Sequence, residues 1–226
     1  MDNKLALKVF GGGWLIPIAV GGMMFAAAGT LNYWQGWLAL VVFCVCSFLN
    51  TVSLFKRDPA LLARRLKAGP AAEKRVSQKI IMCLTFGMFI GMFVVAGFDY
   101  RFGWSQMAPV VVVIGDCMIA LGYVIFEYVF RENTFAAANI NVESNQKVIS
   151  SGPYGIVRHP MYFGALILIV GLSLALGSWW CLALGLVMLP ILIWRIFDEE
   201  RLLADELPGY REYCSSVKYR LIPGVF

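Results

Sequence analysis

The polar residues that could carry chemistry gather in the last third of the chain. The single histidine, His159, lies in the stretch GPYGIVRHPMYFG, which runs from Gly152 to Gly164, and Arg158 stands directly before it. Pro160 follows, and proline favours the first turn of a helix. We therefore expect Arg158 and His159 at the N-terminal end of a helix, where the helix dipole and free N–H groups favour an anion.

A second polar cluster follows an apolar run, in the stretch RIFDEERLL. Asp198, Glu199 and Glu200 place three carboxylates side by side, and Arg195 lies four residues before Glu199. Helical pairing at this spacing neutralises only part of the charge. The cluster is either a solvated helix at the membrane surface or a site where a carboxylate meets a ligand ammonium or sulfonium.

The tail LPGYREYCSSVKYRLIPGVF carries three tyrosines. Tyr210, Tyr213 and Tyr219 are spaced through a short polar segment. Such aromatics either cap a pocket or belong to the aromatic belt at a membrane interface.

The composition is that of a polytopic membrane protein. The 226 residues have a mean hydropathy of +0.73, and 15% are charged, where soluble domains carry about 25%. Six cysteines occur without a CxxC pair and with one histidine, so we expect no metal site and read the cysteines as apolar packing residues. No GxGxxG motif follows a strand pattern, and nothing indicates a nucleic-acid partner.

The apolar runs predict an all-α bundle of about six transmembrane helices in a single domain, because a span needs roughly 20 apolar residues. A run of 34 uncharged residues is too long for one span, and Gly177-Ser178 near its centre predicts a tight turn that makes the last two spans a hairpin. The N-terminal run also resembles a signal peptide, but we interpret it as a retained first span. The expected spans are 11–28, 36–55, 80–98, 108–130, 161–177 and 178–197.

The basic residues test this topology. With six spans, every lysine and arginine except Arg101 falls on one side, and the positive-inside rule then puts both termini in the cytoplasm. The basic segment from Lys56 to Lys79 is expected to form an amphipathic helix at the interface. Its apolar residues should face lipid; these are Leu61, Leu62 and Leu66.

Two acidic residues lie inside the fourth span. Ionisable residues at membrane depth usually face a protein interior. Glu127 is near the cytoplasmic end and is expected to reach water, whereas Asp116 is deeper and has no evident role. Asn133, just beyond this span, is expected to line the same cytoplasmic site as the C-terminal motifs.

Together the motifs resemble a known family. Gly-Pro-Tyr, then Arg-His-Pro-x-Tyr, then a helical hairpin, a Glu-Glu pair and a Tyr-x-x-Tyr tail occur here in order between Val148 and Phe226. This order resembles the isoprenylcysteine carboxyl methyltransferase family of integral-membrane enzymes, with its phospholipid methyltransferase relatives. The segments GTLNYWQGWLAL, DPALLARR and GFDYRFGWS resemble the bacterial branch more than the eukaryotic prenylcysteine enzymes, which favours a bacterial inner membrane.

The resemblance implies a cofactor and a set of site residues. The cofactor would be S-adenosylmethionine, held at the cytoplasmic side by a catalytic region of about 148–226. Arg158 would serve a carboxylate of the cofactor or the substrate, and Glu199 or Glu200 would take the cofactor's amino group. The implied catalytic residues are Arg158 and Glu200, and the implied cofactor-binding residues are Gly152, Pro153, Tyr154, His159, Pro160, Tyr162, Gly164, Glu199, Glu200, Tyr210 and Tyr213.

The reaction implied is methyl transfer to a lipophilic acceptor that enters from the membrane, such as the carboxylate of an isoprenylcysteine-like substrate. The sequence leaves open whether oxygen, sulfur or nitrogen is methylated, and it leaves the oligomeric state open. Two other classes stay in view. The stretch YCSSVKYRLIP also resembles the tails of NADPH-dependent membrane sterol reductases, and a non-catalytic membrane protein would share the composition.

Overall fold

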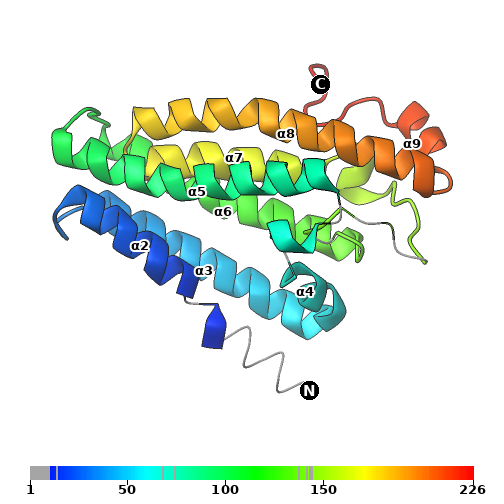
Figure 1. Cartoon of the computed structure of the whole chain (residues 1–226), viewed down its shortest axis with the longest axis horizontal. Helices are drawn as coiled ribbons and strands as arrows, with labels where there is room; N and C mark the ends of the chain where they lie inside the picture. Colours follow the sequence, from blue (N-terminus) through cyan, green and yellow to red (C-terminus); the bar gives the residue numbers. More distant parts are fainter. Residues whose placement is uncertain are drawn as a thin grey trace. The chain divides into compact units, whose positions relative to one another are not determined.

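The computed structural model describes residues 11–13, 15–67, 69–73, 75–136, 138–140, 142 and 145–226. Lys4, Lys8 and Lys74, on which the expected orientation partly depends, lie outside them. The regular structure within these ranges is helical (Figure 1). The helices are α2 (Leu15–Ala28), α3 (Trp34–Arg57), α4 (Pro59–Arg65), η2 (Pro70–Ala72), α5 (Val76–Phe102), α6 (Pro109–Glu132), η3 (Gly152–Gly155), α7 (Pro160–Ala175), α8 (Trp179–Glu206) and α9 (Tyr210–Ser216).

The protein is a polytopic helical membrane bundle, as the composition predicts. Among the described residues, α3, α5, α6 and α8 are long and apolar enough to cross a membrane, whereas α2 and α7 are shorter apolar helices of 14 and 16 residues. Each of the six expected spans corresponds to one of these helices. At 1.5 Å per residue, α7 is about 24 Å long, somewhat less than the ~30 Å hydrocarbon core.

The helices extend beyond the apolar runs from which they were predicted. Helix α5 covers Val76–Phe102 where the apolar pattern covers 80–98, and α8 continues to Glu206 where the expected span ends at 197. Hydropathy marks only the part of a helix that suits lipid, and polar residues continue the same helix into water. The carboxylates of RIFDEERLL therefore stand on a continuous helix that begins within the hairpin.

One compact unit comprises residues 1–48, 87–120 and 168–187. The predicted hairpin turn is present in it, and Gly177 adopts a φ of 68° that only glycine reaches easily. Asp99 is buried and accepts hydrogen bonds from the backbone and hydroxyl of Ser105 and from the hydroxyl of Ser178. The Tyr33 hydroxyl donates to the Leu176 carbonyl. The bonds of Asp99 join the end of α5 and the loop after it to the hairpin turn before α8, and the Tyr33 bond joins the turn before α3 to the same hairpin turn.

Close helix packing in this unit depends on glycine. A Cβ on Gly97 would lie 2.3 Å from the Met24 carbonyl oxygen, and one on Gly115 would lie 2.3 Å from the Ala175 nitrogen. Backbones that approach this closely are typical of membrane helix pairs, where small residues allow van der Waals packing. Asp116 is buried beside this contact, and neither of its carboxylate oxygens has a hydrogen-bond partner among the described residues.

The second unit comprises residues 49–86, 121–167 and 188–226. The expectation that Leu61 and Leu62 face lipid is wrong, because both are buried in the protein, with exposures of 0% and 5%. Arg64 and Arg65, in the last turn of α4, donate to the backbone carbonyls of Thr134 and Ala136. These bonds turn the apolar face of α4 toward the protein, and Leu66 is half-buried.

The Glu127 carboxylate, which was expected to reach water, is bound by side chains of this second unit. Its carboxylate pairs with Arg57 at 2.8 Å and with Arg131 at 2.9 Å, and it accepts hydrogen bonds from Asn50 and Ser53. The four donors come from α3 and α6. The residue therefore joins these two helices at the ends where their basic residues lie.

All six cysteines are free thiols. Cys181 is buried and its thiol donates to the Met92 carbonyl, which suits the packing role expected of it. Cys83 and Cys117 are exposed, so the packing interpretation does not extend to them.

Candidate functional site

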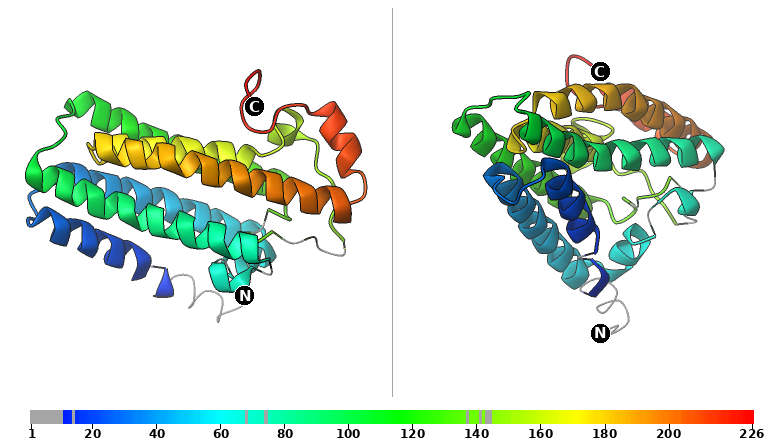
Figure 2. Two further views of the ribbon diagram at one scale, coloured as in Figure 1. Left: turned by 45° about the horizontal axis from the view of Figure 1, so that its top comes forward. Right: turned by 60° about the vertical axis from the view of Figure 1, so that its left-hand side comes forward.

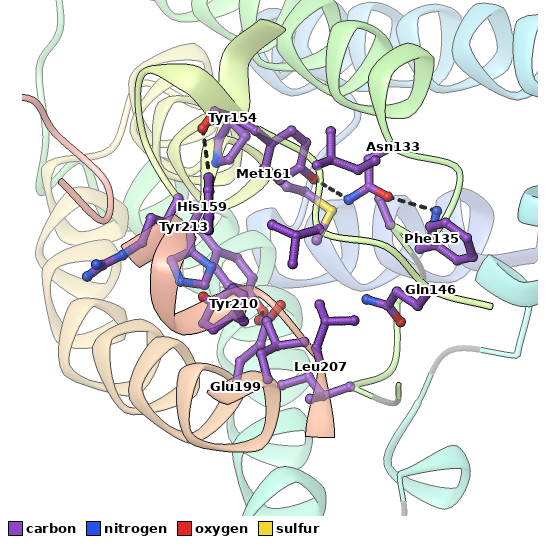
Figure 3. Close-up of a pocket in the computed structure, with 18 of the residues that line it drawn as sticks. Asn133, Phe135, Gln146, Tyr154, His159, Met161, Glu199, Leu207, Tyr210 and Tyr213 are labelled. Carbon is purple, nitrogen blue, oxygen red and sulfur yellow. Dashed lines mark hydrogen bonds between the residues drawn. The ribbon is translucent and has the colours of Figure 1, made fainter. Parts of the chain in front are cut away.

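A polar cavity lies in the second unit and brings the C-terminal motifs together (Figure 3). It encloses about 100 Å³ within a depression whose empty space, open solvent included, is about 830 Å³. The lining residues come from the loop after α6, the start of α7, the end of α8 and α9; they are Asn133, Phe135, Ala136, Ala138, Asn139, Ile140, Gln146, Lys147, Val148, Ile149, Tyr154, Arg158, His159, Pro160, Met161, Tyr162, Arg195, Glu199, Leu203, Leu207, Tyr210 and Tyr213.

The local sequence explains how one wall is built. Pro160 is the first residue of α7, as its position in the motif predicts. Arg158 and His159 lie just before it, and their backbone N–H groups donate to the carbonyls of Tyr219 and Arg220, both at 2.9 Å. The C-terminal tail thus uses two N–H groups that sequence reasoning left free for an anion, and the side chains remain to form the wall.

Glu200 lies at the centre of a cationic cluster. Its carboxylate pairs with Arg158 at 2.8 Å, with Arg220 at 2.9 Å and with the His159 ring at 3.2 Å. Arg220 also stacks over the rings of Phe197 and Phe226. Two guanidinium groups around one carboxylate leave the cluster net positive. Arg158 and His159 belong to the cavity lining, whereas Glu200 does not.

The opposite charge comes from Glu199, one residue earlier on α8. Glu199 lines the cavity and accepts a hydrogen bond from the Tyr162 hydroxyl. Consecutive residues on a helix point about 100° apart, so two neighbouring glutamates serve different surroundings. Glu199 lines the cavity, whereas Glu200 pairs with the cationic side chains, of which Arg158 and His159 line the cavity.

Arg195 fixes the position of Tyr162, which donates to Glu199. Its Nε donates to the Tyr162 hydroxyl at 3.0 Å. Its other nitrogens donate to the Gln78 side chain at 3.1 Å and to the Ala138 carbonyl at 2.9 Å, and the guanidinium pairs with Glu73 at 3.5 Å. Arg195 therefore binds the start of α5 and the loop after α6, and it forms no direct pair with Glu199 as helical spacing suggested.

Three tyrosines complete the cavity. Asn133 donates to the Tyr154 hydroxyl at 3.0 Å, and the Tyr213 hydroxyl donates to the Tyr154 carbonyl at 2.8 Å. Burial raises the pKa of Tyr154 to about 12 and also raises the pKa values of Tyr210 and Tyr213. All three phenols are neutral near pH 7, so they offer hydrogen-bond donors and π faces.

Four residues implied by the family motif do not line the cavity: Gly152, Pro153, Gly164 and Glu200. Gly152 begins η3 with a φ of 54°, and a Cβ there would lie 3.0 Å from the Glu132 carboxyl carbon. A Cβ on Gly164 would lie 3.0 Å from Ile125. These glycines therefore permit turns and packing around the site, and a direct contact between them and the cofactor stays a prediction.

The sequence analysis did not predict that residues of the loop after α6 form one wall of the cavity. Ala138, Asn139 and the segment 146–149 line the cavity, yet they carry no recognisable motif. Their only sequence signal is a polar segment of about twenty residues between two apolar runs, which marks a functional loop without saying what it contacts. Asn133, expected at the site, does line it.

One buried polar atom points to a ligand. The Tyr210 hydroxyl is buried beside the cavity and forms no hydrogen bond with proper geometry to the described residues, although the Cys214 thiol lies close enough to interact with it. Buried hydroxyl groups are normally hydrogen-bonded. A positive wall, a negative wall and neutral aromatic faces together suit a zwitterionic ligand that also carries a cation.

Comparisons with known proteins agree with the motifs. Residues 110–207 match the family model for phospholipid methyltransferases. A probable protein-S-isoprenylcysteine O-methyltransferase of Oryza sativa subsp. indica is 28% identical over 199 residues, covering 81% of this chain and 93% of that protein.

Two further relatives match shorter segments. Delta(14)-sterol reductase TM7SF2 of Mus musculus is 32% identical over 127 residues, covering 48% of this chain and 30% of the reductase. Cobalt-zinc-cadmium resistance protein CzcN of Cupriavidus metallidurans is 30% identical over 119 residues, covering half of each chain. The family model and the long match confirm the resemblance of this chain to the phospholipid methyltransferase and isoprenylcysteine methyltransferase family of membrane proteins.

Proposed function

We propose that this protein is an S-adenosylmethionine-dependent methyltransferase of the membrane that methylates a lipophilic acceptor. The observation that carries the proposal is the charge arrangement of the cavity. Glu199 stands on one wall, Arg158 and His159 stand on another, and neutral tyrosines lie between them.

This arrangement fits the cofactor's own charges. S-adenosylmethionine carries a carboxylate, an ammonium and a sulfonium. The net positive cluster around Glu200 suits the carboxylate, and Glu199 has lone pairs left for the ammonium after it accepts from Tyr162. The faces of Tyr210 and Tyr213 suit a sulfonium through cation–π attraction.

When bound, the cofactor supplies a methyl group on a positively charged sulfur. The residues of this chain bind its charged groups, fix its orientation and exclude water. A carboxylate or thiolate acceptor needs no strong base, so catalysis comes mostly from positioning and desolvation. We propose that Arg158 serves a carboxylate, either that of the cofactor or that of the acceptor.

The acceptor class follows from the membrane setting and from the relatives. The site is built at the ends of apolar membrane helices, and the rice relative that matches most of this chain is named for O-methylation of isoprenylcysteine. We propose an acceptor with an apolar tail and a carboxylate, reached from the membrane. We propose that the site and both termini lie in the cytoplasm, which the distribution of basic residues supports. The resemblance to the bacterial branch supports an inner membrane as the location.

The second candidate is an NADPH-dependent sterol reductase. The 32% identity to the mouse reductase over 127 residues favours it, and the tail stretch YCSSVKYRLIP agrees with it. A reductase cofactor carries several phosphates and needs free cations. Of the basic residues that line the cavity, Arg158 is paired with Glu200 and Arg195 with Glu73, which leaves Lys147 and His159. The carboxylate of Glu199 would oppose it there.

Calorimetric titration of the detergent-purified protein with S-adenosylhomocysteine, beside NADPH, tests the choice. We expect saturable binding of S-adenosylhomocysteine that Glu199→Gln weakens about tenfold or more, since a hydrogen bond to a charged group contributes about 1.5–3 kcal/mol. The matched control is Glu212→Gln, which removes an exposed carboxylate from α9. Binding of NADPH alone would establish the reductase, and binding of neither by folded protein would leave a non-catalytic membrane protein.

A further inference from the structure

An apolar groove runs along the first unit between α2 and α3, which lie side by side (Figure 2). Its volume is about 880 Å³, and its lining is almost entirely apolar. Ile18, Gly22, Ala26 and Gly29 form one wall, at the spacing of a single helix face. A Cβ placed on Gly22 would meet nothing within 4 Å, so the groove is open at its middle.

One end of the groove carries an isolated cation. The groove reaches Gly29, Thr30 and Leu31 in the turn after α2. A Cβ on Gly29 would lie 3.7 Å from the guanidinium carbon of Arg101. Arg101 is exposed, stands near the Phe102 ring at 5.7 Å, and forms no ion pair with the residues that the structure describes. The nearby carboxylate of Asp99 is already occupied by Ser105 and Ser178.

Exposed tryptophans indicate the depth of Arg101 in the membrane. Five tryptophans of this unit, at the start of α3, in the loop after α5 and at the start of α8, are between 46% and 56% exposed; they are Trp34, Trp37, Trp104, Trp179 and Trp180. Exposed tryptophan gathers at the headgroup level of a bilayer. The Trp37 ring nitrogen donates to the Leu31 carbonyl at 2.9 Å and fixes the turn at the mouth of the groove.

We propose that this groove binds one anionic phospholipid, with its phosphate on Arg101 and an acyl chain between α2 and α3. The occupant must be apolar along the groove and anionic at its end, at headgroup level. A guanidinium binds phosphate through paired hydrogen bonds, and nothing else in the described part of this unit neutralises Arg101. The site is separate from the cavity proposed for methyl transfer, and it holds a lipid without reacting with it.

Native mass spectrometry of the detergent-purified protein, titrated with dioleoyl phosphatidylglycerol, tests the proposal. We expect one retained lipid per chain. Arg101→Gln should reduce the retained fraction about tenfold, the loss of one charge-assisted pair, while Arg101→Lys should keep most of it. Gly22→Phe should fill the groove and displace the lipid.

Matched controls separate this site from general lipid adhesion. Gly87→Phe adds the same ring to α5 at another position where a Cβ meets nothing within 4 Å. Arg211→Gln removes an exposed charge from α9. Both should retain the lipid as the wild type does. Equal retention in Arg101→Gln or in Gly22→Phe would overturn the proposal, as would a dimer that Gly22→Phe dissociates without any loss of lipid.

Discussion

Arg195→Met is the substitution that should damage the site most among residues that the family motifs do not name as site residues. The guanidinium is 10% exposed and its partner Glu73 is 1% exposed, so both charges are buried. Removing one partner of a buried ion pair costs about 3–5 kcal/mol, because the other charge is left without compensation. For a chain of this length, each kcal/mol shifts the melting temperature by about 2–4 °C. We therefore expect a fall of roughly 6–20 °C.

The same substitution should weaken ligand binding by a separate route. Arg195 holds the hydroxyl of Tyr162, and Tyr162 in turn donates to Glu199. Without the guanidinium, the Glu199 carboxylate loses its fixed position, and S-adenosylhomocysteine affinity should fall about tenfold. Arg211→Met is the matched control, because that arginine is 75% exposed and its partner Asp205 is 73% exposed, so the ion pair lies in solvent. Its other contact is a hydrogen bond to the Ala204 carbonyl at 3.1 Å. Arg211→Met should change neither quantity.

A double substitution gives the sharper test of the reasoning. If the damage comes from an uncompensated Glu73 carboxylate, then Glu73→Gln added to Arg195→Met should recover part of the lost melting temperature. Thermal unfolding in detergent, followed by near-ultraviolet circular dichroism, measures both variants. A single variant within 2 °C of the control, or a double variant no more stable than the single, would refute the argument.

Further substitutions test Glu200, Gly97 and Tyr154. Glu200→Gln should lower S-adenosylhomocysteine affinity less than Glu199→Gln does, since only Glu199 lines the cavity; calorimetry on the two variants compares them. Gly97→Ala should lower the melting temperature, because its Cβ would lie 2.3 Å from a backbone oxygen. Gly87→Ala adds a Cβ with no heavy atom within 4 Å, so it should raise the free energy of unfolding by up to about 1 kcal/mol. Since burial raises the pKa of Tyr154 to about 12, the folded state should lose stability as pH rises from about 10 toward 12, and Tyr154→Phe should reduce that loss in alkaline unfolding curves.

The six apolar helices, which are α2, α3, α5, α6, α7 and α8, were predictable because each is encoded locally. An apolar run fixes a span, and Gly177 at the centre of a 34-residue run marks the hairpin turn that the structure contains. Pro160 likewise marks the first residue of α7. The error at Leu61 and Leu62 has the opposite cause. An amphipathic pattern shows that one face is apolar, but whether protein or lipid covers that face depends on contacts from distant residues.

In the candidate site too, the sequence predicts what is encoded locally and misses the contacts between distant residues. The motifs indicate which residue types gather near the cavity, and Tyr154, His159 and Tyr162 all line it. They do not indicate that the backbone of the tail satisfies the N–H groups of Arg158 and His159, because that contact spans about sixty residues of sequence. Arg195 was visible as a charge on a helix, yet its partners lie on α5 and on the loop after α6.

Glu199 and Glu200 have different partners, and this difference explains how several charged side chains can lie close together in an apolar chain. A buried carboxylate is costly unless cations and hydrogen bonds compensate it. Glu200 has three such partners and offers little to a ligand, whereas Glu199 has the Tyr162 hydroxyl and keeps lone pairs for another donor. One glutamate therefore holds the cations of the positive wall and the other forms the negative wall, which is the arrangement that the proposed binding of a zwitterionic cofactor requires.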